Sequence, residues 1–148
     1  MRTGASTGRG RPVNRRRLGW LGLILAGAMA GTSVRSALEA AWPAAPGAWP
    51  WTTFWINLSG SFILGALLEF LAASALDANW QRGLRLALGT GLLGGFTTYS
   101  TFAVETAALG TSGAVVTSLG YALASVTAGV LLAAAGMLLV RRLVGGRQ

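Results

Sequence analysis

Four apolar stretches dominate the chain, and each is close to the length that a helix needs to cross a lipid bilayer. They cover residues 18–38, 51–76, 84–109 and 114–140, and about 20 residues of helix span the hydrocarbon core of a membrane. No stretch shows the sustained apolar and polar alternation of membrane strands. Segments rich in proline, glycine or polar residues separate the four. The sequence therefore predicts an all-α membrane protein with four transmembrane helices.

The composition excludes most soluble and catalytic classes. Charged residues make up 11% of the 148 residues and hydrophobic residues 53%, whereas soluble domains carry about 25% charged residues. So short a chain cannot bury that much apolar surface in one globular core. Cysteine and histidine are absent, which excludes thiol nucleophiles, Ser-His-Asp triads and Cys/His metal sites. We expect a protein that is not an enzyme.

The arginines predict an orientation. All 12 basic residues are arginines, and all except Arg35 flank the apolar stretches. With four spans, these flanking arginines all fall on the same side of the membrane. We expect the protein to lie in the plasma membrane, and the positive-inside rule then places both of its termini in the cytoplasm. Basic residues that flank apolar segments do not form the patch of a nucleic-acid binder. We expect a disordered basic tail over 1–17, a membrane domain over 18–140 and a basic C-terminal tail over 141–148.

A secretory signal peptide is a weaker alternative for the N-terminus. Three arginines at 15–17 precede an apolar run that ends in Ala28-Met29-Ala30, which is typical of such a signal. Cleavage there would still leave three apolar spans.

Polar residues recur every four positions along the second stretch and at a similar spacing along the fourth. They are Thr53, Asn57, Ser61, Gly65 and Glu69 in the second stretch, and Ser118, Tyr121, Ser125 and Gly129 in the fourth. Small residues at this spacing also allow close packing of membrane helices. Asn57 and Glu69 fit that role less well, because neither is small and both are costly to bury in hydrocarbon.

The third stretch is poor helix material at its centre. Gly89, Gly91 and Gly94 match a dinucleotide-binding pattern, but no strand precedes them. Gly94-Gly95 precedes several β-branched and hydroxyl residues, which disfavour helix. We therefore expect the third helix to be broken near Gly94–Thr97. Irregular backbone at this depth must be buried in protein or line a polar cavity, and discontinuous spans place carbonyls on cations and helix N-termini on anions. This segment predicts an ion or small-solute site.

The same segment resembles the signature of a known family. Residues 94–102 read Gly-Gly-Phe-Thr-Thr-Tyr-Ser-Thr-Phe and are followed by Glu105, which is similar to the CrcB/Fluc fluoride channel family. Further matches are Gly27-Ala28, Gly31, Arg35, Asn57-Leu58, Gly60-Ser61-Phe62, Gly65, Tyr121, Ser125 and Gly129. The resemblance covers about residues 20–140. It implies a passive, fluoride-specific channel that exports cytoplasmic fluoride and lowers its toxicity, built as an antiparallel, inverted dimer with two pores.

The resemblance also implies roles for individual residues. The backbone carbonyls of Gly94 and Thr97 would hold a structural Na⁺, and carbonyl oxygens suit such a hard cation. The fluoride path would be lined by Asn57, Tyr99, Phe102, Tyr121, Ser125 and Glu105, with Thr53 and Ser61 suggested by their position in the stripe alone. Tyr99 stands where the family usually has phenylalanine, and the positive edge of an aromatic ring can face an anion. Arg35 is either a structural arginine or one that draws fluoride to the vestibule.

The sequence leaves open which subunit the chain pairs with and whether it conducts fluoride passively. An inverted homodimer needs little arginine bias, so the bias here favours pairing with a homologous subunit of opposite orientation rather than with itself. The predicted partners are therefore fluoride, membrane lipid and such a subunit, with no nucleic acid. The alternatives are a non-conducting membrane assembly subunit and a small proton-coupled transporter that uses Glu69 and Glu105.

Overall fold

The computed structural model describes residues 15–145, and every regular element in that part of the chain is a helix, with no strand. Residues 1–14 of the tail predicted over 1–17, and residues 146–148 of the tail predicted over 141–148, lie outside the described residues. Three helices are long: α1 (Arg15–Ala41), α2 (Trp51–Ala73) and α6 (Val115–Gly145). Between α2 and α6 lie four shorter elements: α3 (Ala78–Leu84), the π-helix η1 (Arg85–Leu93), α4 (Gly94–Phe96) and α5 (Tyr99–Thr111). The all-helical prediction is confirmed for the described residues.

The three long helices correspond to the first, second and fourth apolar stretches. Residues 16–41, 51–73 and 115–144 are long and apolar enough to cross a membrane. The third stretch is divided among η1, α4 and α5 and contains no comparably long helix. Both long terminal helices extend beyond the predicted spans, because α1 begins at Arg15 and α6 continues through Arg141 and Arg142. Arginine is a good helix former, so an apolar helix can continue into a basic flank.

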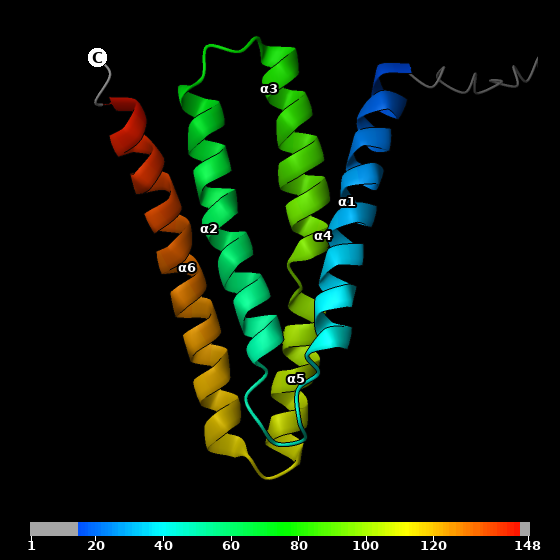
Figure 1. Cartoon of the computed structure of the whole chain (residues 1–148), viewed down its shortest axis with the longest axis vertical. Coiled ribbons are helices and arrows are strands. Elements are labelled where there is room, and N and C mark those ends of the chain that lie inside the picture. The colour runs from blue at the N-terminus through cyan, green and yellow to red at the C-terminus, as the bar shows by residue number, and fades with distance from the viewer. Residues whose placement is uncertain (1–14, 146–148) are drawn as a thin grey trace, which may run out of the picture.

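Successive segments run in opposite directions (Figure 1). The start of α1, the α2–α3 connection and the end of α6 lie at one end of the molecule, and the loops before α2 and after α5 lie at the other. The arginines of the first end are exposed, namely Arg16, Arg17, Arg82, Arg85, Arg141 and Arg142. Arg35 lies instead in the second half of α1. The fold thus separates the flanking arginines from Arg35, as the order of the apolar stretches predicted.

Glycines bring the helices into backbone contact in two pairs. Helix α1 packs on η1 and α4, where a Cβ on Gly31 would collide with the carbonyl oxygen of Leu92 and one on Gly95 with that of Ala28. Helix α2 packs on α6, where a Cβ on Gly65 would collide with the carbonyl oxygen of Ala133. Small residues at helix contacts let backbones approach closely in membranes. The small residues of the polar stripe therefore serve packing as well.

The third apolar stretch is interrupted at Thr97 and Thr98. Thr97 has ψ 154° and Thr98 has φ −142° and ψ 122°, so both have extended backbone. Gly94, Gly95 and Phe96 remain helical, which places the interruption at the end of the predicted range rather than at its glycines. β-branched threonine tolerates extended backbone well. Gly95 instead provides a close contact with α1.

Candidate functional site

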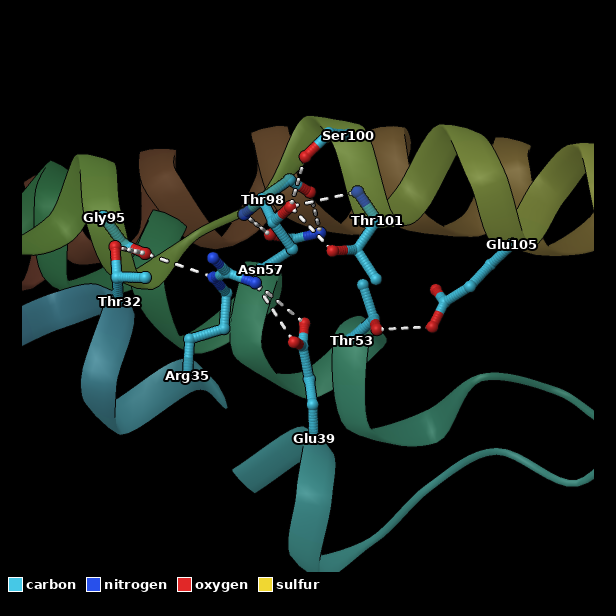
Figure 2. Close-up of polar contacts among 10 residues, drawn as sticks. All are labelled: Thr32, Arg35, Glu39, Thr53, Asn57, Gly95, Thr98, Ser100, Thr101 and Glu105. Carbon is cyan, nitrogen blue, oxygen red and sulfur yellow. Dashed lines mark hydrogen bonds and ion pairs between the residues drawn. The ribbon is translucent and has the colours of Figure 1, made fainter. Parts of the chain in front are cut away.

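The side chain of Asn57 replaces helical hydrogen bonds at the interruption. Its Oδ1 accepts from the backbone N–H of Thr98 at 2.8 Å, and its Nδ2 donates to the carbonyl of Thr98 at 3.0 Å. Figure 2 shows this amide, carried by α2, lying against the extended backbone. Buried backbone polar groups need partners, and here one side chain supplies two of them. This explains why a costly asparagine stands in the stripe of α2.

The interruption also changes the partners of the carbonyls that precede it. In a continuous helix, the N–H of Thr98 would donate to the carbonyl of Gly94, but it donates to Asn57 instead. The next carbonyl, that of Gly95, accepts from Arg35 Nε at 3.2 Å and from Thr32 Oγ1 at 3.4 Å. The Gly94 carbonyl therefore loses its helical donor, whereas the Gly95 carbonyl has gained two new ones.

Thr98 begins α5 as its N-cap. Its Oγ1 accepts from the backbone N–H of Thr101 at 3.1 Å and lies within hydrogen-bond distance of the hydroxyls of Ser100 and Thr101. Threonine is a good N-cap because its oxygen satisfies an otherwise unpaired helix N–H. Thr98 was not predicted to have a role, although a threonine directly before a run of helix-compatible residues is the usual signal for a cap.

A pocket of about 290 Å³ lies against the interruption. It is lined by Asn57, Gly60, Ser61, Leu64, Thr97, Thr98, Tyr99, Phe102, Ser125 and Val126. No charged side chain belongs to this lining. Four of the six residues that the resemblance placed on the fluoride path, Asn57, Tyr99, Phe102 and Ser125, meet here from α2, α5 and α6. Ser61, suggested by the stripe alone, joins them.

Ser125 has an unused hydroxyl in this pocket. Its side chain is buried with 8% exposure, and its Oγ has no hydrogen-bond partner. Within the described residues, only the Trp49 indole nitrogen shares that property among buried side-chain polar atoms. A buried hydroxyl without a partner is destabilising. The site therefore contains a donor that a bound molecule or ion would satisfy.

Three aromatic rings form a row beside the pocket. The ring of Phe102 lies 6.0 Å from that of Tyr99 and 5.3 Å from that of Tyr121, measured between centroids, and both pairs are tilted. Tyr99 is 81% exposed, whereas Tyr121 is fully buried. The row thus runs from the surface of the chain into its core, and Phe102 is its middle member.

Tyr121, the buried end of this row, also belongs to a polar cluster with Glu105. The hydroxyl of Tyr121 donates to Glu105 Oε2 at 2.8 Å, and the hydroxyl of Thr53 donates to Glu105 Oε1 at 2.7 Å. The second of these contacts is drawn in Figure 2. Neither Tyr121 nor Glu105 lines the pocket at the interruption. The structure therefore divides the predicted path residues into a pocket group and this neighbouring carboxylate cluster.

Arg35 lies at the interruption, with its guanidinium between α1 and α4. In addition to the Gly95 carbonyl, it contacts Glu39 one turn later, with Nη1 at 3.0 Å from Oε2 and 3.3 Å from Oε1. Glu39 was not singled out from the sequence, because an acidic residue near the end of an apolar stretch resembles an ordinary flank. The contact explains its presence inside α1.

Glu69 belongs to a different part of the molecule. It pairs with Arg141 of α6 at 2.8 Å, near the arginine-rich end. Glu105 is bound through Thr53, which lies 16 residues before Glu69 on α2, and a helical rise of about 1.5 Å per residue separates the two positions by about 24 Å. The two carboxylates therefore do not share a site.

Comparisons with known proteins agree with the resemblance seen in the sequence. A model of the family described as CrcB-like protein, Camphor Resistance (CrcB), matches residues 22–137. A protein of Cutibacterium acnes named fluoride-specific ion channel FluC 1 is 44% identical over 128 residues, which cover 86% of this chain and 90% of that protein. Proteins named fluoride-specific ion channel FluC 2 from Leifsonia xyli and Nocardia farcinica are 43% and 41% identical, over 79% and 80% of this chain and 80% and 79% of their own lengths.

The family model covers the interruption and every residue that lines the pocket. The relatives are named as channels and not as enzymes. The chain belongs to the CrcB-like protein family.

Proposed function

We propose that this chain is a subunit of a passive, fluoride-selective channel that lets fluoride leave the cytoplasm and so lowers its toxicity. The observation that carries the proposal is the match to fluoride-specific channels over most of the chain, including the interrupted third span. The pocket at the interruption supports it, because its unpartnered hydroxyl is suited to a small anion. Under this proposal the third segment, although divided, completes a fourth membrane crossing.

The pocket offers weak donors without a fixed charge. Ser125 supplies a free hydroxyl, and Asn57 Nδ2 has a second hydrogen besides the one given to Thr98. The edges of the Tyr99 and Phe102 rings add positive potential. Conduction requires binding that is favourable enough to admit an ion and weak enough to release it. An uncharged lining meets that condition better than an arginine or lysine would.

The proposed channel would hold a structural Na⁺ through backbone carbonyl oxygens at the interruption. Within residues 15–145, no three histidine, cysteine, aspartate or glutamate side chains gather into a metal site. The Gly94 carbonyl has lost its helical donor, and Thr97 has extended backbone. We propose that these two carbonyls hold Na⁺, which would supply positive charge and rigidity at the centre of the assembly.

Fluoride efflux from liposomes tests the proposed function. The full chain would be reconstituted alone and together with a homologue of opposite arginine bias, in Na⁺ and in Na⁺-free buffer, and release would be followed with fluoride and chloride electrodes. We expect fluoride release with chloride retained, and a smaller release without Na⁺. If neither preparation releases fluoride, the chain is a non-conducting assembly subunit.

Glu105→Gln distinguishes a channel from a proton-coupled transporter. Glutamine keeps the shape of Glu105 and can still accept from Thr53 or Tyr121 through its carbonyl. We therefore expect fluoride flux to fall by less than about tenfold, the equivalent of about 1.4 kcal/mol, and not to become dependent on a proton gradient. Loss of a proton-driven flux in this variant, with Glu69→Gln as the comparison, would instead establish coupled transport.

The separation of arginines supports a fixed orientation in the membrane. We propose that both termini are cytoplasmic and that the partner is a homologous subunit inserted the other way, because the described flanking arginines lie in elements that meet at one end of the fold, namely Arg16, Arg17, Arg82, Arg85, Arg141 and Arg142. Cysteines introduced singly at the arginine-rich end and in the 42–50 loop would report orientation in cells by their labelling with an impermeant reagent. We expect labelling from outside only in the loop. Labelling of both positions, together with flux by the chain alone, would favour an inverted homodimer.

A further inference from the structure

A face of α1 is built around the Gly95 carbonyl. Thr32, Arg35 and Glu39 lie three and four residues apart, so they share one side of the helix. Figure 2 shows Thr32 and Arg35 directed at Gly95, with Glu39 behind the guanidinium. Thr32 and Arg35 donate to the same oxygen, and Arg35 is held by both oxygens of Glu39. We call Arg35, Glu39 and the Gly95 carbonyl the α1 brace.

The brace compensates for a hydrogen bond that the interruption removes. In a continuous helix, the Gly95 carbonyl would accept from the N–H of Tyr99, but Thr97 and Thr98 are extended and direct the chain away. A charged donor makes a stronger bond than a neutral one. Arg35 therefore stabilises the interrupted form of the segment over the continuous one.

Glu39 determines where the Arg35 side chain lies. An arginine has several rotatable bonds, and fixing one long side chain costs conformational entropy. With both oxygens of Glu39 engaged on Nη1, Nε is left to point at Gly95. The two side chains are only 19% and 26% exposed, so the pair is partly shielded from water and from screening by salt. The pair also leaves no net charge at this position.

We propose that Glu39 is a positioning residue of the channel: through Arg35 it fixes the Gly95 carbonyl and thereby the interruption that shapes the pocket. The inference rests on the proposed function for its flux readout. It does not depend on that function for its structural readout, which is the protection of backbone amides at the interruption.

The decisive variant exchanges the two charges. Arg35→Glu combined with Glu39→Arg keeps an ion pair one turn apart on α1, but the side chain at position 35 can no longer donate to the Gly95 carbonyl. We expect this double variant to melt close to the wild-type temperature, yet to lose fluoride flux by about tenfold, the effect of losing one charge-assisted hydrogen bond. If the pair only stabilised α1, the exchange would restore flux as well.

Single substitutions grade the effect. Glu39→Gln retains one acceptor for Arg35 and should keep most of the flux, whereas Glu39→Ala releases the guanidinium and should resemble the exchanged variant. Glu69→Ala removes a carboxylate from the other ion pair, that with Arg141, and is the matched control with flux near the wild-type value.

Hydrogen–deuterium exchange separates this inference from the proposed function. In Glu39→Ala and in the exchanged variant, we expect faster exchange over residues 94–102 than in wild type, with α6 unchanged. Unchanged exchange and wild-type flux in the exchanged variant would overturn the role of Glu39. The other outcome is faster exchange in these variants but no fluoride flux in the wild type or in any variant, with or without the partner. That result would support the α1 brace and overturn the proposed channel function.

Discussion

Replacing Asn57 with alanine is expected to lower the rate of fluoride flux about a hundredfold. The variant loses both hydrogen bonds to Thr98, and each buried backbone group left without a partner costs about 1–3 kcal/mol. Leaving two such groups without partners lowers the ratio of the interrupted to the continuous form of this segment by about a hundredfold or more. The measurement is the initial rate of fluoride release from liposomes at equal protein content.

Two further variants show whether the amide acts through the backbone. Asn57→Asp keeps an acceptor for the Thr98 N–H but loses the donor to its carbonyl, so we expect an effect of the same sign. Asn79→Ala removes an amide from α3, outside the pocket, and should conduct like wild type. Normal flux in Asn57→Ala would show that the amide is needed for neither the interruption nor the pathway.

Replacing Phe102 with leucine is expected to have a comparably large effect through a different cause. Leucine fills part of the space and keeps the apolar contact with the core, but it has no ring to face Tyr99 or Tyr121. The positive ring edge that would meet an anion disappears. We expect flux to fall by about a hundredfold, because removing one preorganised electrostatic contact to a charge has an effect of about that size, while the protein stays folded.

Phe70 provides the matched control for this experiment. It lies on α2 with 51% exposure and outside the pocket, so Phe70→Leu should leave both flux and melting temperature near the wild-type values. If Phe102→Leu lowers the melting temperature as strongly as the flux, the ring serves packing and not conduction. If flux is unchanged, the aromatic row has no role in the pathway.

Features that depend on neighbouring residues could be predicted from the sequence. The spans follow from apolar length, and the interruption of the third span follows from a local run of glycine and threonine. The interruption lies at Thr97 and Thr98 and not at Gly94 or Gly95, and Gly95 lies in close contact with Ala28 of α1. That contact is between segments more than 60 residues apart, so local propensity could not reveal it.

Features that depend on distant partners could not be predicted. The sequence placed Asn57 on a polar stripe, but it could not show that the amide binds a backbone 41 residues away. Likewise, Arg35 was assigned either a structural or an ion-attracting role, and its contact with Gly95, 60 residues away, is visible only in the fold. The π-helix of Arg85–Leu93 had no recognised signal either. A stripe gives the direction of a side chain and not the group that it meets.

The exposure of Tyr99 has a consequence for any pathway along this pocket. Tyr99 is 81% exposed, even though it lines the same pocket as Ser125. Under the proposed function, one wall of the fluoride pathway is therefore missing from a single chain, and lipid hydrocarbon would replace it poorly beside hydroxyl and amide groups. Permeation is then a property of the interface between two subunits, and one subunit alone supplies only part of the wall of the pathway.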